Sequence, residues 1–149
     1  MIDEKIKELQ PIYLDFLSQL IKIPSEFGNE RKAQVFVKQK MKKLKLDVNE
    51  YLSRKDREYI SLSATKLGSD SKNYRSIALN AHCDIVPVDD EKRWRLSPFS
   101  GKIIKDKIFG RGALDDKSGI AIILMIADVF YQLGLKHKGD IIFQSVIED

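Results

Sequence analysis

Hydrophobic residues recur at helical spacing in the first part of the chain. Between residues 3 and 22 the apolar positions lie three or four apart, which predicts an amphipathic helix with a boundary or kink at Pro11. The same spacing returns over residues 30–44, with lysines on the opposite face, and Asn29 is the expected N-cap of this second helix. Pro24 and Gly28 place a loop between the two. Both helices are expected to pack on a core through their apolar faces.

Strand-like runs come next. Residues 46–52 alternate loosely and residues 59–67 alternate clearly, so each predicts a strand, with a polar turn at 54–58 between them. The apolar runs 77–81 and 140–147 are short and continuous, which is typical of strands buried on both faces of a sheet. Residues 103–109 predict a small hairpin, and the aperiodic stretch 88–100 predicts a long loop.

Residues 118–133 are apolar almost all round, which predicts a helix buried on most sides and ended by Gly134. Strands that alternate with helices indicate an α/β fold whose sheet is at least partly parallel. The predicted fold class is therefore α/β, with a mixed, partly parallel sheet flanked by helices. A chain of 149 residues is long enough to form a core.

Composition narrows the function classes. Apolar residues make up 43% and charged residues 32% of the chain, and no apolar run is long enough to span a bilayer, so neither a membrane protein nor a signal peptide is indicated. The single Cys83 excludes an intramolecular disulfide and fits a reducing compartment, so the cytoplasm is the expected location. The net charge is +4, and lysines crowd residues 38–45. Because aromatic residues are not interleaved with them, a solvated helix face is favoured over a nucleic-acid site.

Two polar constellations follow strand-like runs. His82 and Asp84 point the same way on an extended segment, so the carboxylate could hold the imidazole of a metal ligand. The alternative is a histidine that caps a strand end. Asp115 and Asp116 lie between the glycines of Gly110-Arg-Gly112 and the apolar helix, where capping or a solvated turn would also explain them. Two adjacent carboxylates repel each other unless metal ions or Lys117 offset their charge.

Glu148 and Asp149 form a third constellation, after the strand predicted at 140–147. One carboxylate of such a pair could bind a metal ion while the other accepts a proton. The alternative is a polar chain end.

Together these pieces resemble the co-catalytic zinc peptidase and deacylase family of acetylornithine deacetylase, succinyl-diaminopimelate desuccinylase, aminoacylase and glutamate carboxypeptidase. The matching segments are LNAHCDIVPV (79–88), Trp94 with SPFSGKIIKDKIFGRGALDDKSG (97–119), and GDIIFQSVIED (139–149). The middle segment is the most specific, and weaker similarity extends to the first helix. The resemblance implies a zinc-peptidase-like fold and a metal-dependent hydrolase.

The resemblance also implies roles for single residues. His82 matches a ligand of the first metal, Asp84 the carboxylate that orients this histidine, and Asp115 the carboxylate that bridges two zinc ions. The family usually has a cis peptide after that aspartate, so Asp115–Asp116 is expected to be cis. Glu148 and Asp149 correspond to the general base and a ligand of the second zinc, but spacing favours Asp149 as the base whereas side-chain length favours Glu148.

Other parts of the family pattern have no counterpart in the chain. The family needs a further acidic ligand, a late histidine ligand and an inserted lid domain that often dimerises, whereas His137 lies in a Lys-His-Lys setting typical of a surface loop. Residues 1–149 are therefore expected to be the N-terminal part of an incomplete catalytic domain, and the complete enzyme is expected to dimerise.

The resulting hypothesis is a two-zinc hydrolase that cleaves an amide bond of an N-acyl amino acid or small peptide, with no nucleic-acid or membrane partner. Histidine and carboxylate ligands would also suit cobalt or manganese. The alternative is a truncated, non-catalytic fragment that acts at most as a structural or interaction module. Either way, the 149 residues alone are expected to be inactive.

Overall fold

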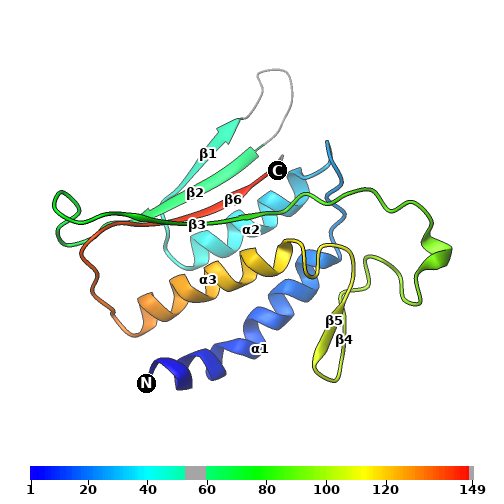
Figure 1. Cartoon of the computed structure of the whole chain (residues 1–149), viewed down its shortest axis with the longest axis horizontal. Helices are drawn as coiled ribbons and strands as arrows, with labels where there is room; N and C mark the ends of the chain where they lie inside the picture. Colours follow the sequence, from blue (N-terminus) through cyan, green and yellow to red (C-terminus); the bar gives the residue numbers. More distant parts are fainter. Residues whose placement is uncertain (53–59, 148–149) are drawn as a thin grey trace.

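The computed structural model describes residues 1–52 and 60–147 of the chain. Within that part the helices are α1 (Ile2–Ile21), α2 (Arg31–Lys43) and α3 (Lys117–Gln132), with one short 3-10 helix, η1 (Glu91–Arg93). The strands are β1 (Val48–Leu52), β2 (Ile60–Lys66), β3 (Ile77–His82), β4 (Lys102–Ile104), β5 (Lys107–Phe109) and β6 (Ile141–Val146). Figure 1 shows their arrangement.

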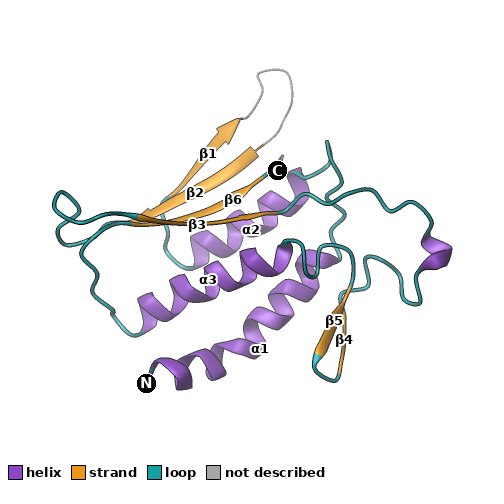
Figure 2. Cartoon of the chain, viewed as in Figure 1, coloured by secondary structure: helices purple, strands orange, loops and turns teal. Residues whose placement is uncertain are grey.

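The main sheet is mixed and partly parallel, as predicted. Its strand order is β1-β2-β6-β3, with β2 antiparallel to both of its neighbours and β3 parallel to β6. All three α-helices lie on the same side of this sheet in Figure 2. α3 packs on β3 and β6, α2 packs on β1 and β2, and α1 packs mainly on α3. The strands β4 and β5 form the separate hairpin that the sequence predicted.

The core lies between the sheet and the helices. Each helix buries one stripe, at Leu9, Tyr13, Phe16, Leu17 and Leu20 in α1, at Ala33, Val37 and Met41 in α2, and at Ile120, Ile123 and Leu124 in α3. Phe143 at the centre of β6 is fully buried and is aligned with Ala64 of β2 and Leu79 of β3. Burying one such large apolar side chain stabilises a fold by about 1.5–3 kcal/mol.

One burial prediction is wrong. β3 was expected to be buried on both faces, but among the described residues it pairs only with β6, so it lies at the sheet edge, and Ile77 is 55% exposed. The helix α3 is buried on most sides, as expected, although Ile122 is 53% exposed. An apolar run shows that a segment can be buried, whereas the neighbouring elements decide which face is covered.

Helix boundaries differ slightly from expectation. α1 continues through Pro11 without a break. The N-cap of α2 is Glu30 rather than Asn29, and the buried Glu30 carboxylate accepts a hydrogen bond from the Gly28 amide at 2.7 Å. The turn expected at 54–58 lies outside the described residues. Among the helices that are described, none has the length and apolar character needed to cross a membrane.

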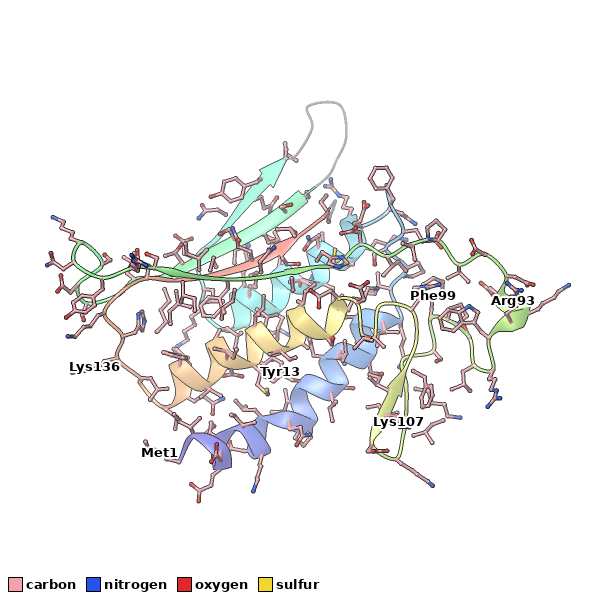
Figure 3. All side chains as sticks on the ribbon, in the orientation of Figure 1. Met1, Tyr13, Arg93, Phe99, Lys107 and Lys136 are labelled. Carbon is pink, nitrogen blue, oxygen red and sulfur yellow. The ribbon has the colours of Figure 1, made fainter. Side chains whose placement is uncertain are left out.

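The long loop after β3 and the β4–β5 hairpin extend from one end of the molecule. Figure 3 labels Arg93, Phe99 and Lys107 at this end, and Met1 and Lys136 at the opposite end. His82, the last residue of β3, leads directly into this loop. The described site residues therefore gather where β3 meets the loop.

Candidate metal centre

His82 is fixed by the segments on both sides of it. Its neighbour Cys83 donates a backbone hydrogen bond to the Val146 carbonyl at 3.1 Å, which extends the pairing of β3 with β6. The Ser25 hydroxyl donates to the Cys83 carbonyl at 2.6 Å, and the Ile85 amide donates to the Ser25 carbonyl at 3.0 Å. The loop after α1 thus holds the backbone on either side of Asp84, directly after the histidine.

A glycine-rich turn brings Asp115 toward His82. Gly112 has a φ of +80°, and a Cβ atom there would lie 2.9 Å from the Ile85 side chain. At Gly110 a Cβ atom would lie only 2.3 Å from the side chain of Ile21. Between them, the Arg111 amide donates to the Pro98 carbonyl at 2.7 Å. Only glycine permits this close approach at both positions, so the motif has a structural cause.

Lys117 anchors the start of α3. Its side chain is fully buried, and its ammonium donates to the carbonyls of Leu20 at 3.1 Å and Ile23 at 2.7 Å. Burial lowers its pKa to about 8. Since the ammonium bonds these carbonyls, Lys117 ties α3 to the end of α1 rather than pairing with Asp115 or Asp116 as one sequence hypothesis allowed.

His82 and Asp115 meet at the end of β3. The His82 Nε2 atom lies 3.0 Å from Asp115 Oδ1, and the His82 Nδ1 atom lies 3.1 Å from the backbone oxygen of Asp84. The Asp84 carboxylate is 3.5 Å from Nδ1, so the closer partner of that nitrogen is the backbone oxygen. The Asp115 side chain is 86% exposed, and the Asp115–Asp116 peptide is cis, as expected.

The surroundings change the proton affinity of His82. Burial on its own lowers the pKa of the imidazole, but the hydrogen bond with Asp115 and the negative charge of Asp84 outweigh it, so the pKa is raised above its ordinary value. With an acceptor at each ring nitrogen, both N–H groups of the imidazolium are bonded. Loss of the Nε2 proton leaves a lone pair that faces the Asp115 carboxylate.

These two donors fit a metal ion. Imidazole nitrogen and carboxylate oxygen both bind zinc at about 2.0–2.2 Å, which places two ligands of a tetrahedral ion about 3.3 Å apart. The observed 3.0 Å between Nε2 and Oδ1 is close to that separation. Within residues 1–52 and 60–147 no three His, Cys, Asp or Glu side chains form a candidate metal cluster. Glu148 and Asp149, the other predicted site residues, lie outside the described part.

A cavity of about 430 Å³ adjoins this pair. Its lining includes His82, Asp84, Asp115, Trp94 and Arg111. Among the described residues, the buried side-chain polar atoms without a hydrogen-bond partner are Asp84 Oδ1 and Arg111 Nε. Both therefore belong to residues of this one cavity, where an unpartnered polar atom calls for a ligand, ion or water.

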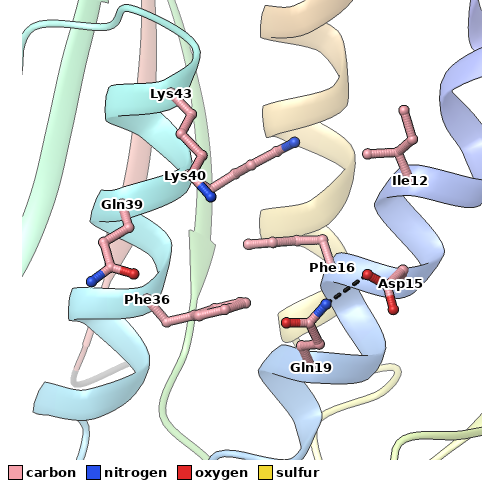
Figure 4. A pocket seen from close by; sticks show the side chains of 8 residues that line it. All are labelled: Ile12, Asp15, Phe16, Gln19, Phe36, Gln39, Lys40 and Lys43. Atoms are coloured by element: carbon pink, nitrogen blue, oxygen red, sulfur yellow. Dashed lines mark hydrogen bonds between the residues drawn. The ribbon is translucent and has the colours of Figure 1, made fainter.

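Two further cavities differ in character. One of about 410 Å³ shares Trp94 and Gly110 with the first cavity and is lined mainly by apolar groups, including Ile104 and Phe109. A smaller one of about 200 Å³ lies between α1 and α2. Figure 4 shows the side chains around it, among them Phe16, Phe36 and the hydrogen-bonded pair Asp15 and Gln19. Its lining contains no histidine or cysteine, so the cavity beside His82 is the better candidate for chemistry.

Sequence reasoning did not assign a role to Arg111, Trp94 or Ser25. Arg111 and Trp94 were recognised only as parts of a motif. The two glycines that flank Arg111 could have indicated that its backbone is closely packed and its side chain therefore fixed in position. The hydrogen bond of Ser25 to the Cys83 carbonyl joins segments that are 58 positions apart, so no local pattern could indicate it.

Comparison with known proteins agrees with the resemblance expected from the sequence. Residues 78–148 match the model of Peptidase family M20/M25/M40. Succinyl-diaminopimelate desuccinylase of Blochmanniella floridana is 32% identical over 125 residues, which cover 84% of this chain and 32% of that protein. N-formyl-4-amino-5-aminomethyl-2-methylpyrimidine deformylase of Halalkalibacterium halodurans is 38% identical over 80 residues, 54% of this chain and 19% of that protein.

Solved structures share the fold. Human carnosine dipeptidase 1 superposes with a TM-score of 0.81 at 20% identity, covering 97% of this chain and 33% of that one. The M20 family metallo-carboxypeptidase Sso-CP2 of Sulfolobus solfataricus has a TM-score of 0.75 at 22% identity, covering 90% and 30%. This chain thus spans about a third or less of the length of these four proteins.

Proposed function

We propose, from the placement of residues 78–148 in peptidase family M20/M25/M40, that this chain supplies ligands to the metal centre of a hydrolase that cleaves amide bonds. The proposed substrates are N-acyl amino acids or small peptides. The observation that carries the proposal is the approach of His82 Nε2 to Asp115 Oδ1 at 3.0 Å beside a cavity large enough for a small ligand.

His82 and Asp115 are the proposed metal ligands, with zinc as the proposed metal and cobalt or manganese as alternatives. When bound, the metal supplies Lewis-acid polarisation of the substrate carbonyl and lowers the pKa of water. The chain's own residues prepare the site. The Asp84 backbone oxygen accepts a hydrogen bond from the Nδ1–H group, which directs the Nε2 lone pair toward Asp115, and the Asp84 carboxylate adds negative charge close to the same ring.

The proton-transfer role is proposed for the terminal carboxylates. Glu148 or Asp149 would act as the general base and the other would bind the second of two zinc ions, as the family pattern suggests. Both follow β6, which lies beside β3 in the sheet, so the C-terminal ends of these parallel strands lie at the same edge.

We further propose that residues 1–149 form the N-terminal part of the catalytic domain and are inactive alone. A catalytic zinc normally has three protein ligands and a water, and the described residues bring together two proposed ligands. The lid domain, the homodimer and the cytoplasmic location of the complete enzyme belong to this proposal. The competing proposal is a non-catalytic fragment that acts at most as a structural or interaction module.

Zinc titration by calorimetry, paired with an N-acetyl amino acid hydrolysis assay, tests the proposal on the purified chain. We expect weak zinc binding that His82→Ala removes and that the matched variant His137→Ala retains, with no turnover. Zinc binding that does not depend on His82 would refute the proposed ligand. Tight binding of two zinc ions with measurable turnover would refute the proposed inactivity of the chain alone.

A further inference from the structure

Arg111 is held beside the proposed metal ligands by its backbone. It precedes Asp115 by four residues, and it lines the same cavity as His82 and Asp115. The close approach of Gly110 to Ile21 and the hydrogen bond from the Arg111 amide to the Pro98 carbonyl fix its backbone on both sides. The Cα atom of Arg111, from which the side chain extends, is therefore fixed next to the proposed metal ligands.

The guanidinium of Arg111 has no anionic partner in residues 1–52 and 60–147. Its Cζ atom lies 5.1 Å from the centre of the Trp94 ring, which is a cation–π distance, and its Nε atom is buried with no hydrogen-bond acceptor in the described part of the chain. Two other cations do have partners, since Lys38 pairs with Glu50 and the Lys117 ammonium donates to two carbonyls. A permanent positive charge with a buried, unused donor is thus located in the cavity itself.

An unpaired cation at this place has a specific consequence. It repels a metal ion bound nearby, and that repulsion is relieved when an anionic ligand lies between them. A guanidinium offers a planar fork of donors that matches the two oxygens of a carboxylate, and stacking on an aromatic ring sets the plane of the fork in advance. The chemistry of Arg111 and Trp94 therefore selects a carboxylate.

We propose that Arg111, stacked on Trp94, binds a carboxylate group of the substrate and so restricts the enzyme to anionic amides. This inference rests on the proposed function, which supplies the amide substrate. The carboxylate can come from the amino acid part of the substrate or from a dicarboxylic acyl group, since both present the same two oxygens. The cavity of about 430 Å³ is large enough for either.

Trp94 is the single tryptophan of the chain, so its fluorescence reports on this site alone. The experiment titrates the purified, metal-free chain with N-acetylglycine, with N-succinylglycinamide and with the uncharged N-acetylglycinamide. We expect a saturable change in Trp94 fluorescence with at least one carboxylate and none with the uncharged amide. The carboxylate that binds more tightly identifies which part of the substrate faces Arg111. Equal responses to charged and uncharged probes, or no response to any, would overturn the proposal.

Variants separate binding from folding. Arg111→Gln is expected to weaken carboxylate binding about tenfold or more, and Arg111→Lys, which retains the charge without the fork, is expected to weaken it less. Arg95→Gln, at an exposed arginine next to Trp94 in the sequence, is the matched control and should bind as the unmodified chain does. Unchanged affinity in both Arg111 variants would contradict the inference. If Arg111→Gln fails to fold by circular dichroism, Arg111→Lys decides.

Metal binding is measured on the same variants by calorimetry. If zinc binding depends on His82 but carboxylate binding is unchanged in the Arg111 variants, this inference is rejected and the proposed metal centre is supported. If carboxylate binding depends on Arg111 but zinc binding is unchanged in His82→Ala, the proposed metal ligand is rejected instead.

Discussion

The interface between the helices and the cavity beside His82 both contain polar side chains out of contact with water, and the two regions differ in how these groups are bonded. At the helix interface the buried Tyr13 hydroxyl of α1 donates to Asp128 Oδ2 of α3 at 2.9 Å, and Gln132 donates to Asp128 Oδ1 at 2.8 Å. Lys40 of α2 lies 4.3 Å from the centre of the Tyr13 ring. Figure 3 labels Tyr13 at this interface, where three helices share one satisfied network.

At the cavity, in contrast, Asp84 Oδ1 and Arg111 Nε are buried without partners among residues 1–52 and 60–147, and the Asp115 side chain is largely exposed. Leaving a buried polar group unsatisfied costs about 1–3 kcal/mol. A fold can tolerate this loss of stability because the packing of the helices offsets it. The unsatisfied atoms can then serve as partners for a ligand. The comparison assigns the Tyr13 network to stability and the cavity to binding.

The largest expected effect concerns activity. In an enzyme that completes the proposed metal centre, His82→Ala should abolish amide hydrolysis because it removes a ligand. Asp84→Asn should lower activity about 10–100-fold, as is typical when a group behind a metal ligand is lost. Steady-state kinetics with His137→Ala as the control measures both. Asp84→Asn kinetics equal to those of the parent enzyme would refute a role of the Asp84 carboxylate, since this variant retains the backbone oxygen.

The next effect concerns stability alone. Tyr13→Phe should lower the free energy of unfolding by about 1–3 kcal/mol, because Asp128 then keeps a buried oxygen without its donor. Tyr74→Phe, at an exposed tyrosine, should change it by less than about 0.5 kcal/mol. Urea denaturation of the metal-free chain gives both values. Neither substitution should alter zinc binding, and a loss of zinc binding in Tyr13→Phe would break the separation of the two regions.

The Tyr13 contribution should also depend on pH. Burial, and then the hydrogen bond to Asp128, raise the pKa of Tyr13 above its ordinary value of 10.0. A group whose pKa is raised on folding stabilises the fold fully below its unfolded pKa and loses that contribution as pH rises toward the folded pKa. The gap in unfolding free energy between the parent chain and Tyr13→Phe should therefore be constant near neutral pH and shrink above pH 10. A constant gap at all pH values would contradict this.

The smallest expected effect is at Arg111. Arg111→Met removes an unpaired buried donor and retains an apolar side chain of similar length, so the free energy of unfolding should stay equal or rise by about 1 kcal/mol or less. Thermal unfolding of the metal-free chain measures it. A clear loss of stability would show that the stacking of Arg111 on Trp94 holds the loop, and would weaken the contrast with the Tyr13 network.

Much of the secondary structure could be predicted because it depends on the spacing of apolar residues within short segments. The three- and four-residue spacing placed α1 and α2, the alternation at 59–67 placed β2, and Lys105-Asp-Lys107 between apolar pairs placed the hairpin of β4 and β5. The order of strands could not be read in the same way. The apolar run of β3 is like that of β6, yet one lies at the edge and the other inside the sheet, because pairing between distant segments decides the position.

The candidate site was predicted in part for the same reason. His82 and Asp115 each follow an apolar run, so their meeting at one sheet edge was expected, and the structure places them 3.0 Å apart. The contact of the His82 Nδ1 atom with the Asp84 backbone oxygen was not expected, because the type of a residue does not indicate where its backbone oxygen points. The burial of Lys117 was missed because lysine is rarely found inside a protein.

The most direct test of the central claim, that His82 and Asp115 hold a metal ion, is imidazole ¹⁵N NMR of the histidine-labelled chain during a zinc titration. The chain has two histidines, so His137 serves as an internal control, and His137→Gln assigns the signals. We expect zinc to shift the His82 Nε2 signal while Nδ1 retains its proton and His137 stays unchanged. Asp115→Asn should require more zinc for the same shift. A shift at His137 equal to that at His82, or no shift at His82 at any zinc concentration, would contradict the account.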